Sequence, residues 1–489
     1  MRLIYAAFFL LMVVIASAQC QKTAKDFLDE GNILYSQGKY DEAIKVYDEA
    51  LKYNPQFADA WTNRGLALDS QGKNDEAVKA YDEAIKIDPQ FARAWNNKGN
   101  ALYGQGRYDE ALKSYGEAIR INPQYANGWN GKGMVLNELG KYHEAVQAFD
   151  EAIKNNPQFA DAWSNKGLAL YRQKKYNDSL KVYEEALRIN PQYAKAWNGK
   201  GMVLNELGKH NEAVQAFNEA IKNNPQFADA WSNKGMILSK LGNYNDSIDA
   251  FNKAIEINPQ LKEAWFNKGL ALHQQKKYND SLKAYDEAIR IDPEYANAWF
   301  NKGNGLDDLG EYEEAIKAYD ESIRIDPRDA MAWFSKGASL YYQGKNNESI
   351  KAYDEAIRLN PNYAKAWNGK SAALNNLSNS DIISFTTFLS WNGKSGALNN
   401  LSRYEEALRF AEKAIELDPK LASAWNNKGT ALNALGKYDE ALKALDEAIR
   451  FDPEDSVYWD NKGRLLRFLH RDAEADAAFA KAKELGYKG

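Results

Sequence analysis

Proline and tryptophan recur in this chain at one constant interval. Ten prolines follow one another at this interval from Pro55 to Pro361, and ten tryptophans do so from Trp61 to Trp367. After one interruption the interval resumes at Trp391, and all 12 prolines and all 13 tryptophans obey it. A period of about 34 residues restricts the fold to an array of small units, each of which stacks on the next.

A single unit, residues 92–125, shows what is repeated. Trp95, Gly99 and Leu102 are four and three residues apart, which places them on one face of a helix. Gly106 then allows the chain to turn, and Pro123 ends the unit, because the residue before a proline is disfavoured in a helix. Between these two positions a second amphipathic helix is marked by Tyr108, Ala111, Leu112, Tyr115, Ala118 and Ile119. The unit is therefore predicted to be a helix hairpin.

This pattern resembles the tetratricopeptide repeat over about residues 24–489. The residues that carry the resemblance are Trp95, Gly99, Leu102, Ala111, Tyr115, Ala118 and Pro123, with their equivalents in the other units. The resemblance implies an all-α fold, a right-handed superhelical α-solenoid of stacked 34-residue helix hairpins. Because one hairpin cannot bury its own apolar face, we expect the units to stabilise one another. The small glycine and alanine positions should let the helices approach closely, and the tryptophans should belong to the scaffold.

The same pattern predicts how the chain is divided. Residues 24–363 make ten tandem repeats, and residues 388–489 make three more. Residues 364–387 form an atypical partial repeat, because WNGKSAALNNLS from Trp367 is nearly copied as WNGKSGALNNLS from Trp391. The segment 379–390 between the copies lacks the repeat pattern. It is either a hinge or docking point, or an insertion that the solenoid tolerates, and we expect weaker stacking there.

Residues 1–18 differ from the rest of the chain. Arg2 precedes an uncharged apolar run over residues 3–15, and Ala16-Ser17-Ala18 follows with the small residues that a signal peptidase recognises. The run is shorter than the roughly 20 residues of a membrane-spanning helix. Residues 1–18 are predicted to be a signal peptide, and the protein to be exported to the cell envelope surface or beyond. An N-terminal membrane anchor, with a lipid on Cys20, is the alternative.

Composition and motifs point away from catalysis and nucleic acid. With 63 basic and 68 acidic residues the net charge is -5, whereas nucleic acid needs clustered positive charge. The 4 histidines lie outside any metal-ligand spacing, and no phosphate loop or nucleophile motif is present. We therefore expect no enzyme activity, no catalytic or metal-binding residue and no cofactor.

A row of basic residues occupies the seventh position of successive repeats, as in Lys98, Lys166 and Lys200. A polyanion could bind such a row. However, this position lies roughly opposite the face that the family turns to its groove. We expect each lysine to pack between helices and reach an acidic residue of a second helix.

In the tetratricopeptide family the first helices line the concave groove. Asparagine recurs at the sixth position of these helices, at Asn63, Asn97, Asn165, Asn233, Asn267, Asn301, Asn427 and Asn461. This is similar to the asparagine ladder of the O-linked N-acetylglucosamine transferases, which holds an extended peptide by its backbone. An amide both donates and accepts hydrogen bonds, which suits a peptide unit. Alternatively, asparagine is simply a polar residue on an exposed helix.

Aromatic residues add a second candidate surface. Phe266, Phe300 and Phe334 occupy the fifth position in three consecutive repeats, with Tyr341 nearby, and they are predicted to form an apolar stripe in the groove. Alternatively, the rings are tucked between helices. The leading interpretation is a scaffold that binds an extended polypeptide, with a protein or peptide partner. The alternatives are an architectural component that self-associates and a binder of extended glycans.

Overall fold

A computed structural model describes residues 22–370 and 418–487, and between them the positions 372, 373, 376, 404, 405, 407–409, 411, 412 and 414–416. The predicted signal peptide and the segment 379–390 lie outside the described residues. The chain divides into two compact units, residues 1–237 and 238–489, and each is described by itself.

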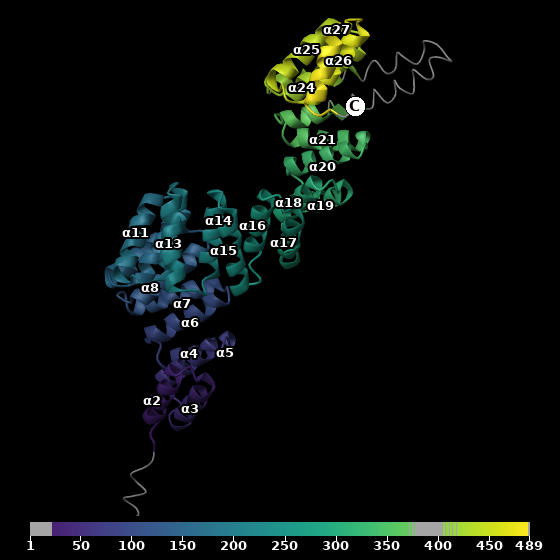
Figure 1. The fold of residues 1–489 in the computed structure, drawn as a ribbon. Coiled ribbons are helices and arrows are strands. Elements are labelled where there is room, and N and C mark those ends of the chain that lie inside the picture. The colour runs from purple at the N-terminus through teal and green to yellow at the C-terminus, as the bar shows by residue number, and fades with distance from the viewer. Residues whose placement is uncertain are drawn as a thin grey trace, which may run out of the picture. The chain divides into compact units, whose positions relative to one another are not determined.

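In the described ranges the fold consists of helices that alternate between a first and a second helix of each repeat (Figure 1). The first helices up to the end of the first unit are α2 (Ala24–Ser36), α4 (Ala58–Ser70), α6 (Ala92–Gly104), α8 (Ala126–Glu138), α10 (Ala160–Arg172), α12 (Ala194–Glu206) and α14 (Ala228–Lys240), in which the unit boundary falls. The second helices that follow α2 to α12 are α3 (Tyr40–Tyr53), α5 (Asn74–Ile87), α7 (Tyr108–Ile121), α9 (Tyr142–Asn155), α11 (Tyr176–Ile189) and α13 (His210–Asn223).

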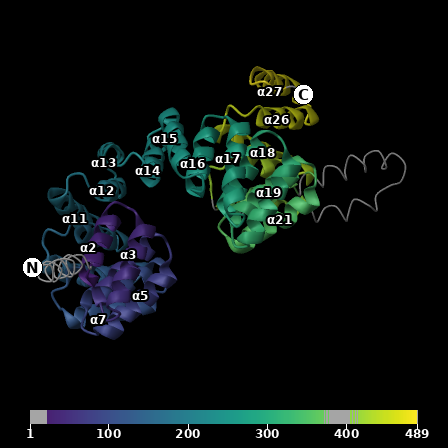
Figure 2. The same ribbon diagram turned by 90° about the horizontal axis from the view of Figure 1, so that it is seen from below.

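The second unit continues the alternation. After α15 (Tyr244–Ile257), its first helices are α16 (Lys262–Gln274), α18 (Ala296–Asp308), α20 (Ala330–Tyr342), α24 (Ala422–Ala434) and α26 (Ser456–Phe468). Its remaining second helices are α17 (Tyr278–Ile291), α19 (Tyr312–Ile325), α21 (Asn346–Leu359), α25 (Tyr438–Phe451) and α27 (Asp472–Glu484). Residues 364–370 are also helical. Within each unit the hairpins stack in chain order (Figure 2), so the predicted all-α solenoid of helix hairpins is confirmed.

A hydrogen bond explains why proline and tryptophan share one period. The indole N–H of Trp95 donates to the main-chain oxygen of Pro89, six residues earlier, at 3.1 Å. Every tryptophan in the described ranges makes the same bond. Proline ends one repeat, and the bond ties that end to the first helix of the next. The indoles are half-buried rather than fully buried, and they belong to the scaffold as predicted.

In most of the described hairpins a glycine of the first helix lies against an aromatic ring of the second, whereas in α24 and α25 Gly429 lies against Leu445. A Cβ atom on Gly99 of α6 would lie 2.7 Å from the ring of Tyr115 in α7, and one on Gly133 of α8 would lie 2.6 Å from Phe149 in α9. Tyr115 and Phe149 are almost fully buried. Only glycine leaves room for these rings, which confirms that the regular spacing of glycine reflects a close approach of the two helices.

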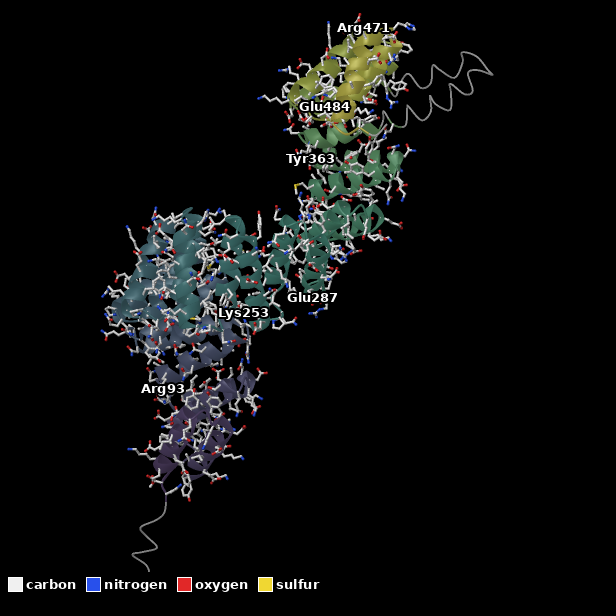
Figure 3. All side chains as sticks on the ribbon, viewed as in Figure 1. Arg93, Lys253, Glu287, Tyr363, Arg471 and Glu484 are labelled. Atoms are coloured by element: carbon white, nitrogen blue, oxygen red, sulfur yellow. The ribbon has the colours of Figure 1, made fainter. Side chains whose placement is uncertain are left out.

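The seventh-position lysines have a structural role, as predicted. Lys98 forms an ion pair with Asp82 of the preceding second helix at 2.6 Å, and its ammonium group lies 5.6 Å from the centre of the Trp95 ring. The equivalent ion pair recurs in other repeats, as for Lys166, Lys200, Lys302, Lys336, Lys428 and Lys462. In these repeats the positive charge is therefore balanced within the stack, whereas Gly116 and Asn252 stand where the acid would lie for Lys132 and Lys268. Charges elsewhere, such as Arg471 and Glu484, lie exposed on the surface (Figure 3).

The contact between glycine and ring yields a stability test. Replacing Gly99 with Ala is expected to destabilise the fold by about 1–3 kcal/mol, because the methyl group would overlap the Tyr115 ring. The matched control is Gly116→Ala in α7, where an added Cβ meets nothing within 4 Å. That variant should gain roughly 0.5–1 kcal/mol, since alanine favours a helix over glycine. Urea unfolding followed by circular dichroism measures both, and equal effects would contradict the packing account.

Candidate functional site

Asparagines of neighbouring first helices are hydrogen-bonded to each other. The side-chain N–H of Asn165 in α10 donates to the side-chain oxygen of Asn130 in α8 at 3.0 Å. In the same way, the side-chain N–H of Asn233 donates to the side-chain oxygen of Asn198, which lies 35 residues earlier, at 3.0 Å. We call this series, which includes Asn461 with Asn426 and Asn427 with Asn368, the amide ladder. The bonds of Asn165 and Asn233 use only one of the two N–H groups of the donor amide, whereas Asn427 also donates to the main-chain oxygen of Asn368 at 3.3 Å.

The two predicted asparagines nearest the N-terminus are held differently. Asn63 donates to Asn32 of α2 at 2.7 Å and accepts from the guanidinium of Arg93 at 3.3 Å. Asn97 is buried and accepts a hydrogen bond from its neighbour Asn96 at 3.3 Å. Asn63 therefore takes part in contacts between repeats, whereas Asn97 contacts its own helix.

The amide ladder is interrupted where phenylalanine takes the fifth position. Phe266 stands at the position where the ladder would need an amide oxygen for Asn301. Asn301 donates instead to the main-chain oxygen of Asn297 in its own helix, at 2.8 Å. Asn267 is half-buried at the same position of the preceding helix.

The three phenylalanines pack against tyrosines. Phe266 lies 5.1 Å from the ring of Tyr295 and 6.0 Å from that of Tyr285. Phe334 has both equivalent contacts, at 5.8 Å from Tyr353 and 5.0 Å from Tyr363. Phe300 has only the first, at 5.8 Å from Tyr319, because Asp329 stands where the second tyrosine would be. All three phenylalanine rings are half-buried. Each ring thus packs on the buried tyrosine of its own repeat, and Phe266 and Phe334 also contact the tyrosine just before the next first helix.

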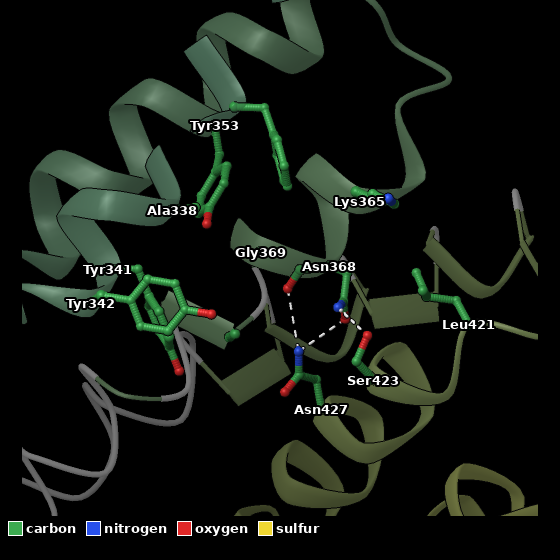
Figure 4. A pocket seen from close by; sticks show the side chains of 12 residues that line it. Ala338, Tyr341, Tyr342, Tyr353, Lys365, Asn368, Gly369, Leu421, Ser423 and Asn427 are labelled. Carbon is green, nitrogen blue, oxygen red and sulfur yellow. Dashed lines mark hydrogen bonds between the residues drawn. The ribbon is translucent and has the colours of Figure 1, made fainter. Parts of the chain in front are cut away.

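Tyr341 lies at a pocket that we call the aromatic pocket. The pocket has a volume of about 390 Å³ and lies among α20, α21, residues 364–370 and the start of α24 (Figure 4). Tyr341 lines it together with Phe334, Ala338, Tyr342, Tyr353, Lys365, Asn368, Gly369, Ala372, Leu421, Ser423 and Asn427. The sequence identified Phe334 and Tyr341. It did not identify Lys365 or Ser423. The small residues Ala338 and Gly369, where other repeats have larger ones, could have indicated a hollow at this place.

A second pocket, the amide pocket, lies on α6 and α8 in the first unit. It measures about 350 Å³ and is lined by Leu66, Arg93, Asn96, Asn97, Asn100, Tyr125, Asn127, Asn130, Gly131 and Met134. The side-chain oxygen of Asn96 is buried there without a hydrogen-bond partner among the described residues. Arg93 is already paired with Asp59 at 2.7 Å. The pocket is therefore rich in amides and nearly neutral, and fifth-position asparagines such as Asn96 and Asn130 are the residues that sequence reasoning missed.

A titratable cluster lies beside the aromatic residues of the second unit. Asp307 in α18 accepts hydrogen bonds from Tyr319 at 2.7 Å and from Ser339 at 2.7 Å. Burial raises the pKa of Asp307, and the bonds from Ser339 and Tyr319 oppose that shift without cancelling it. The same burial raises the pKa of the Tyr319 hydroxyl. The cluster connects α18 to α19 and α20 through one carboxyl group.

Over the ranges that the structure describes, no group of three or more His, Cys, Asp or Glu side chains could hold a metal ion. Within those same ranges, no helix has the length and apolar character needed to cross a membrane.

Comparison with known families identifies the repeats. Tetratricopeptide repeat models match residues 28–92, 68–126, 130–194, 166–227, 266–330, 300–364 and 334–381, and also 228–261 and 422–455. The chain belongs to the tetratricopeptide repeat family. A protein prenyltransferase alpha subunit repeat model also matches residues 404–435. No curated protein matches the chain.

Solved structures of the same architecture resemble the chain at low sequence identity. YrrB, described as a tetratricopeptide repeat protein with an unusual peptide-binding site, is 22% identical, with 39% of this chain and 98% of YrrB covered and a TM-score of 0.32. The Cut9–Hcn1 hetero-tetramer of the APC/C is 15% identical over 94% of this chain and 93% of the matched chain, with a TM-score of 0.45. A Parabacteroides merdae tetratricopeptide repeat protein is 18% identical over 51% of this chain and 98% of its own length, with a TM-score of 0.44.

The Asp307 cluster predicts a pH dependence of stability. Because the pKa of Asp307 is raised in the folded state, the folded protein holds this proton more tightly than the unfolded chain does. Its contribution to stability is therefore lost as pH rises from the ordinary aspartate pKa through the raised value. Asp307→Asn, which keeps an acceptor for Tyr319, is expected to raise the unfolding midpoint at pH 7. The gain should shrink at acidic pH, and a gain that is independent of pH would contradict this account.

Proposed function

We propose that this protein is an interaction scaffold that holds an extended polypeptide along its first helices. Tetratricopeptide repeat proteins generally serve as scaffolds for protein interactions, and the repeats here occupy most of the chain. The proposal assigns the protein no catalytic step and no cofactor. The partner is a protein or peptide, bound through side chains that the stack itself does not require.

The amide ladder is the observation that carries this proposal. Its asparagines recur at the spacing of the repeats, and the pairs at Asn165 and Asn233 keep one N–H group each beyond the bond between helices. Because the pairing fixes the amide orientation, little side-chain entropy is lost when a partner binds. A regular row of donors and acceptors matches the peptide backbone, which repeats its own N–H and carbonyl groups.

The ladder can be tested by substitution. Replacing both Asn165 and Asn233 with Ala is expected to weaken binding of most peptides by about tenfold, because two hydrogen bonds to the backbone are lost. The loss should be similar for peptides of different sequence. Peptides selected from a random display library on the purified protein, and measured by calorimetry, provide the affinities.

The control for this experiment is Lys253→Ala, since Lys253 is exposed on α15 and pairs with the neighbouring Glu256 of the same helix at 2.7 Å. Its affinities should equal those of the unaltered protein. If the library yields no binding peptide and the protein instead forms polymers that grow with concentration, the architectural alternative takes the place of the scaffold.

We also propose that the protein is exported. The support is the sequence of residues 1–18, in which Arg2, an apolar run and Ala16-Ser17-Ala18 follow in the order of a signal peptide. Expression of the full chain should yield a product outside the cytoplasm whose N-terminus is residue 19. N-terminal sequencing of each cell fraction measures this. A cytoplasmic product that still begins at Met1 would exclude cleavage and export, and a membrane-bound product with a modified Cys20 would favour the anchor.

A further inference from the structure

The aromatic pocket exists because three small residues replace larger ones. The ninth position of the first helix holds Leu66, Leu168 or Leu270 in other repeats, but here it holds Ala338 and, one repeat later, Ala372. The sixth position holds Gly369, and a Cβ atom there would lie 2.5 Å from the Tyr353 ring. The missing side chains leave a hollow of about 390 Å³ above Tyr353, within the range of ligand pockets.

The walls of this hollow are mostly aromatic. Phe334 lies against Tyr353 at 5.8 Å, and Tyr341 lies against Tyr342 at 5.8 Å in an edge-on contact. Figure 4 shows Tyr341 and Tyr342 on one side of the hollow and Tyr353 on another. Tyr342 also stacks on Tyr312 at 5.4 Å, although it is 66% exposed. An exposed aromatic side chain that is held in place by a second ring loses little entropy on binding a partner.

The remaining side of the pocket is polar. The side chain of Asn368 donates to the hydroxyl of Ser423 at 2.8 Å, and Asn427 donates to the side-chain oxygen of Asn368 at 2.9 Å. These bonds, drawn as dashed lines in Figure 4, extend the amide ladder along the edge of the pocket. Lys365 is the only charged residue among those that line the pocket, so its charge is not balanced by an acidic residue of the lining.

We propose that the aromatic pocket takes one aromatic side chain of the bound polypeptide, and that Lys365 selects an acidic residue beside it. This inference rests on the proposed function, because Asn368 at the edge of the pocket belongs to the amide ladder proposed to hold the peptide backbone. The ligand class is an extended peptide with a Phe, Tyr or Trp residue next to Asp or Glu. Aromatic walls favour an aromatic ring, and the lone cation favours the acidic neighbour.

A single substitution can close the pocket with a side chain that already occurs at the equivalent position of another repeat. Leu168 stands at the position of Ala338 in an earlier repeat, which has the same tyrosine and glycine at Tyr183 and Gly199. The chain thus already accommodates leucine in this setting. Ala338→Leu is therefore expected to fill the hollow and leave the fold intact, and circular dichroism and the unfolding midpoint verify that it does.

The test uses the purified protein and synthetic peptides derived from the display selection. Each peptide is made with its aromatic residue intact or replaced by Ala, and with its acidic residue intact or replaced by the matching amide. Ala338→Leu should weaken binding of the aromatic peptides roughly tenfold or more and leave the alanine peptides unchanged. Lys365→Gln should remove the preference for the acidic over the amide peptide. Leu168→Ala, the matched change in the other compact unit, should alter neither.

The outcomes separate this inference from the function on which it rests. Peptides that lose affinity with the ladder variant but not with Ala338→Leu or Lys365→Gln would overturn the pocket assignment and leave the scaffold standing. Failure of the protein to bind any peptide would overturn both. Competition by an oligosaccharide series that Ala338→Leu abolishes would show that the pocket holds a sugar, which would also overturn the assignment.

Discussion

The contact of one aromatic ring with a glycine determines the geometry of most of the described hairpins, and Leu445 takes the place of the ring against Gly429. Tyr115 lies over Gly99 of its own repeat, and the same ring reaches Gly131 in the first helix of the next one, where an added Cβ would lie 2.3 Å away. Tyr183 with Gly199 and Tyr353 with Gly369 repeat this second contact. One side chain therefore sets both the spacing within a hairpin and the spacing between hairpins. Because the ring contacts neighbouring first helices, it also sets how far apart their side chains stand, and thus the width of any site built on them.

The stacking contacts leave the first-helix face free to vary. Proline and tryptophan are joined by a hydrogen bond, and most of the lysines pair with an acid of the preceding second helix, so these positions recur almost unchanged. The fifth, sixth and ninth positions vary more and hold residues as different as asparagine, serine, glycine, phenylalanine, leucine, methionine and alanine. Two pockets of opposite character result, an amide pocket on α6 and α8 and an aromatic pocket beside α20. A scaffold of nearly identical repeats can thus acquire local specificity through a few substitutions.

The sequence predicts the fold well and the site only in part, for a physical reason. Helix hairpins follow from the constant period of proline and tryptophan, and the pairing of lysine with acid follows from helical geometry, since both depend on residues that recur in each repeat. The bond from Asn165 to Asn130 does not follow, because spacing alone does not show which of two neighbouring amides donates. The partners of Phe266 were missed for a similar reason, since Tyr285 lies on α17 and Tyr295 lies just before α18. The aromatic pocket arises where side chains are small. An alanine or glycine in the sequence does not by itself show whether neighbouring side chains fill the space beside it.

The aromatic pocket lies beside the segment whose sequence is duplicated at Trp367 and Trp391. Asn427 bonds to Asn368 across 59 residues, whereas the bond from Asn165 to Asn130 spans 35. The excess equals the offset between the two copied tryptophans, Trp367 and Trp391, so the stack of first helices continues with its usual contact despite the extra chain. Stacking depends on which helices meet in space, not on their separation in the sequence, so a duplication here does not abolish the ladder. Gly369 and Ala372, which lie just before the extra residues, are two of the three small residues that open the aromatic pocket. The place where the pattern is broken thus lies beside the aromatic pocket.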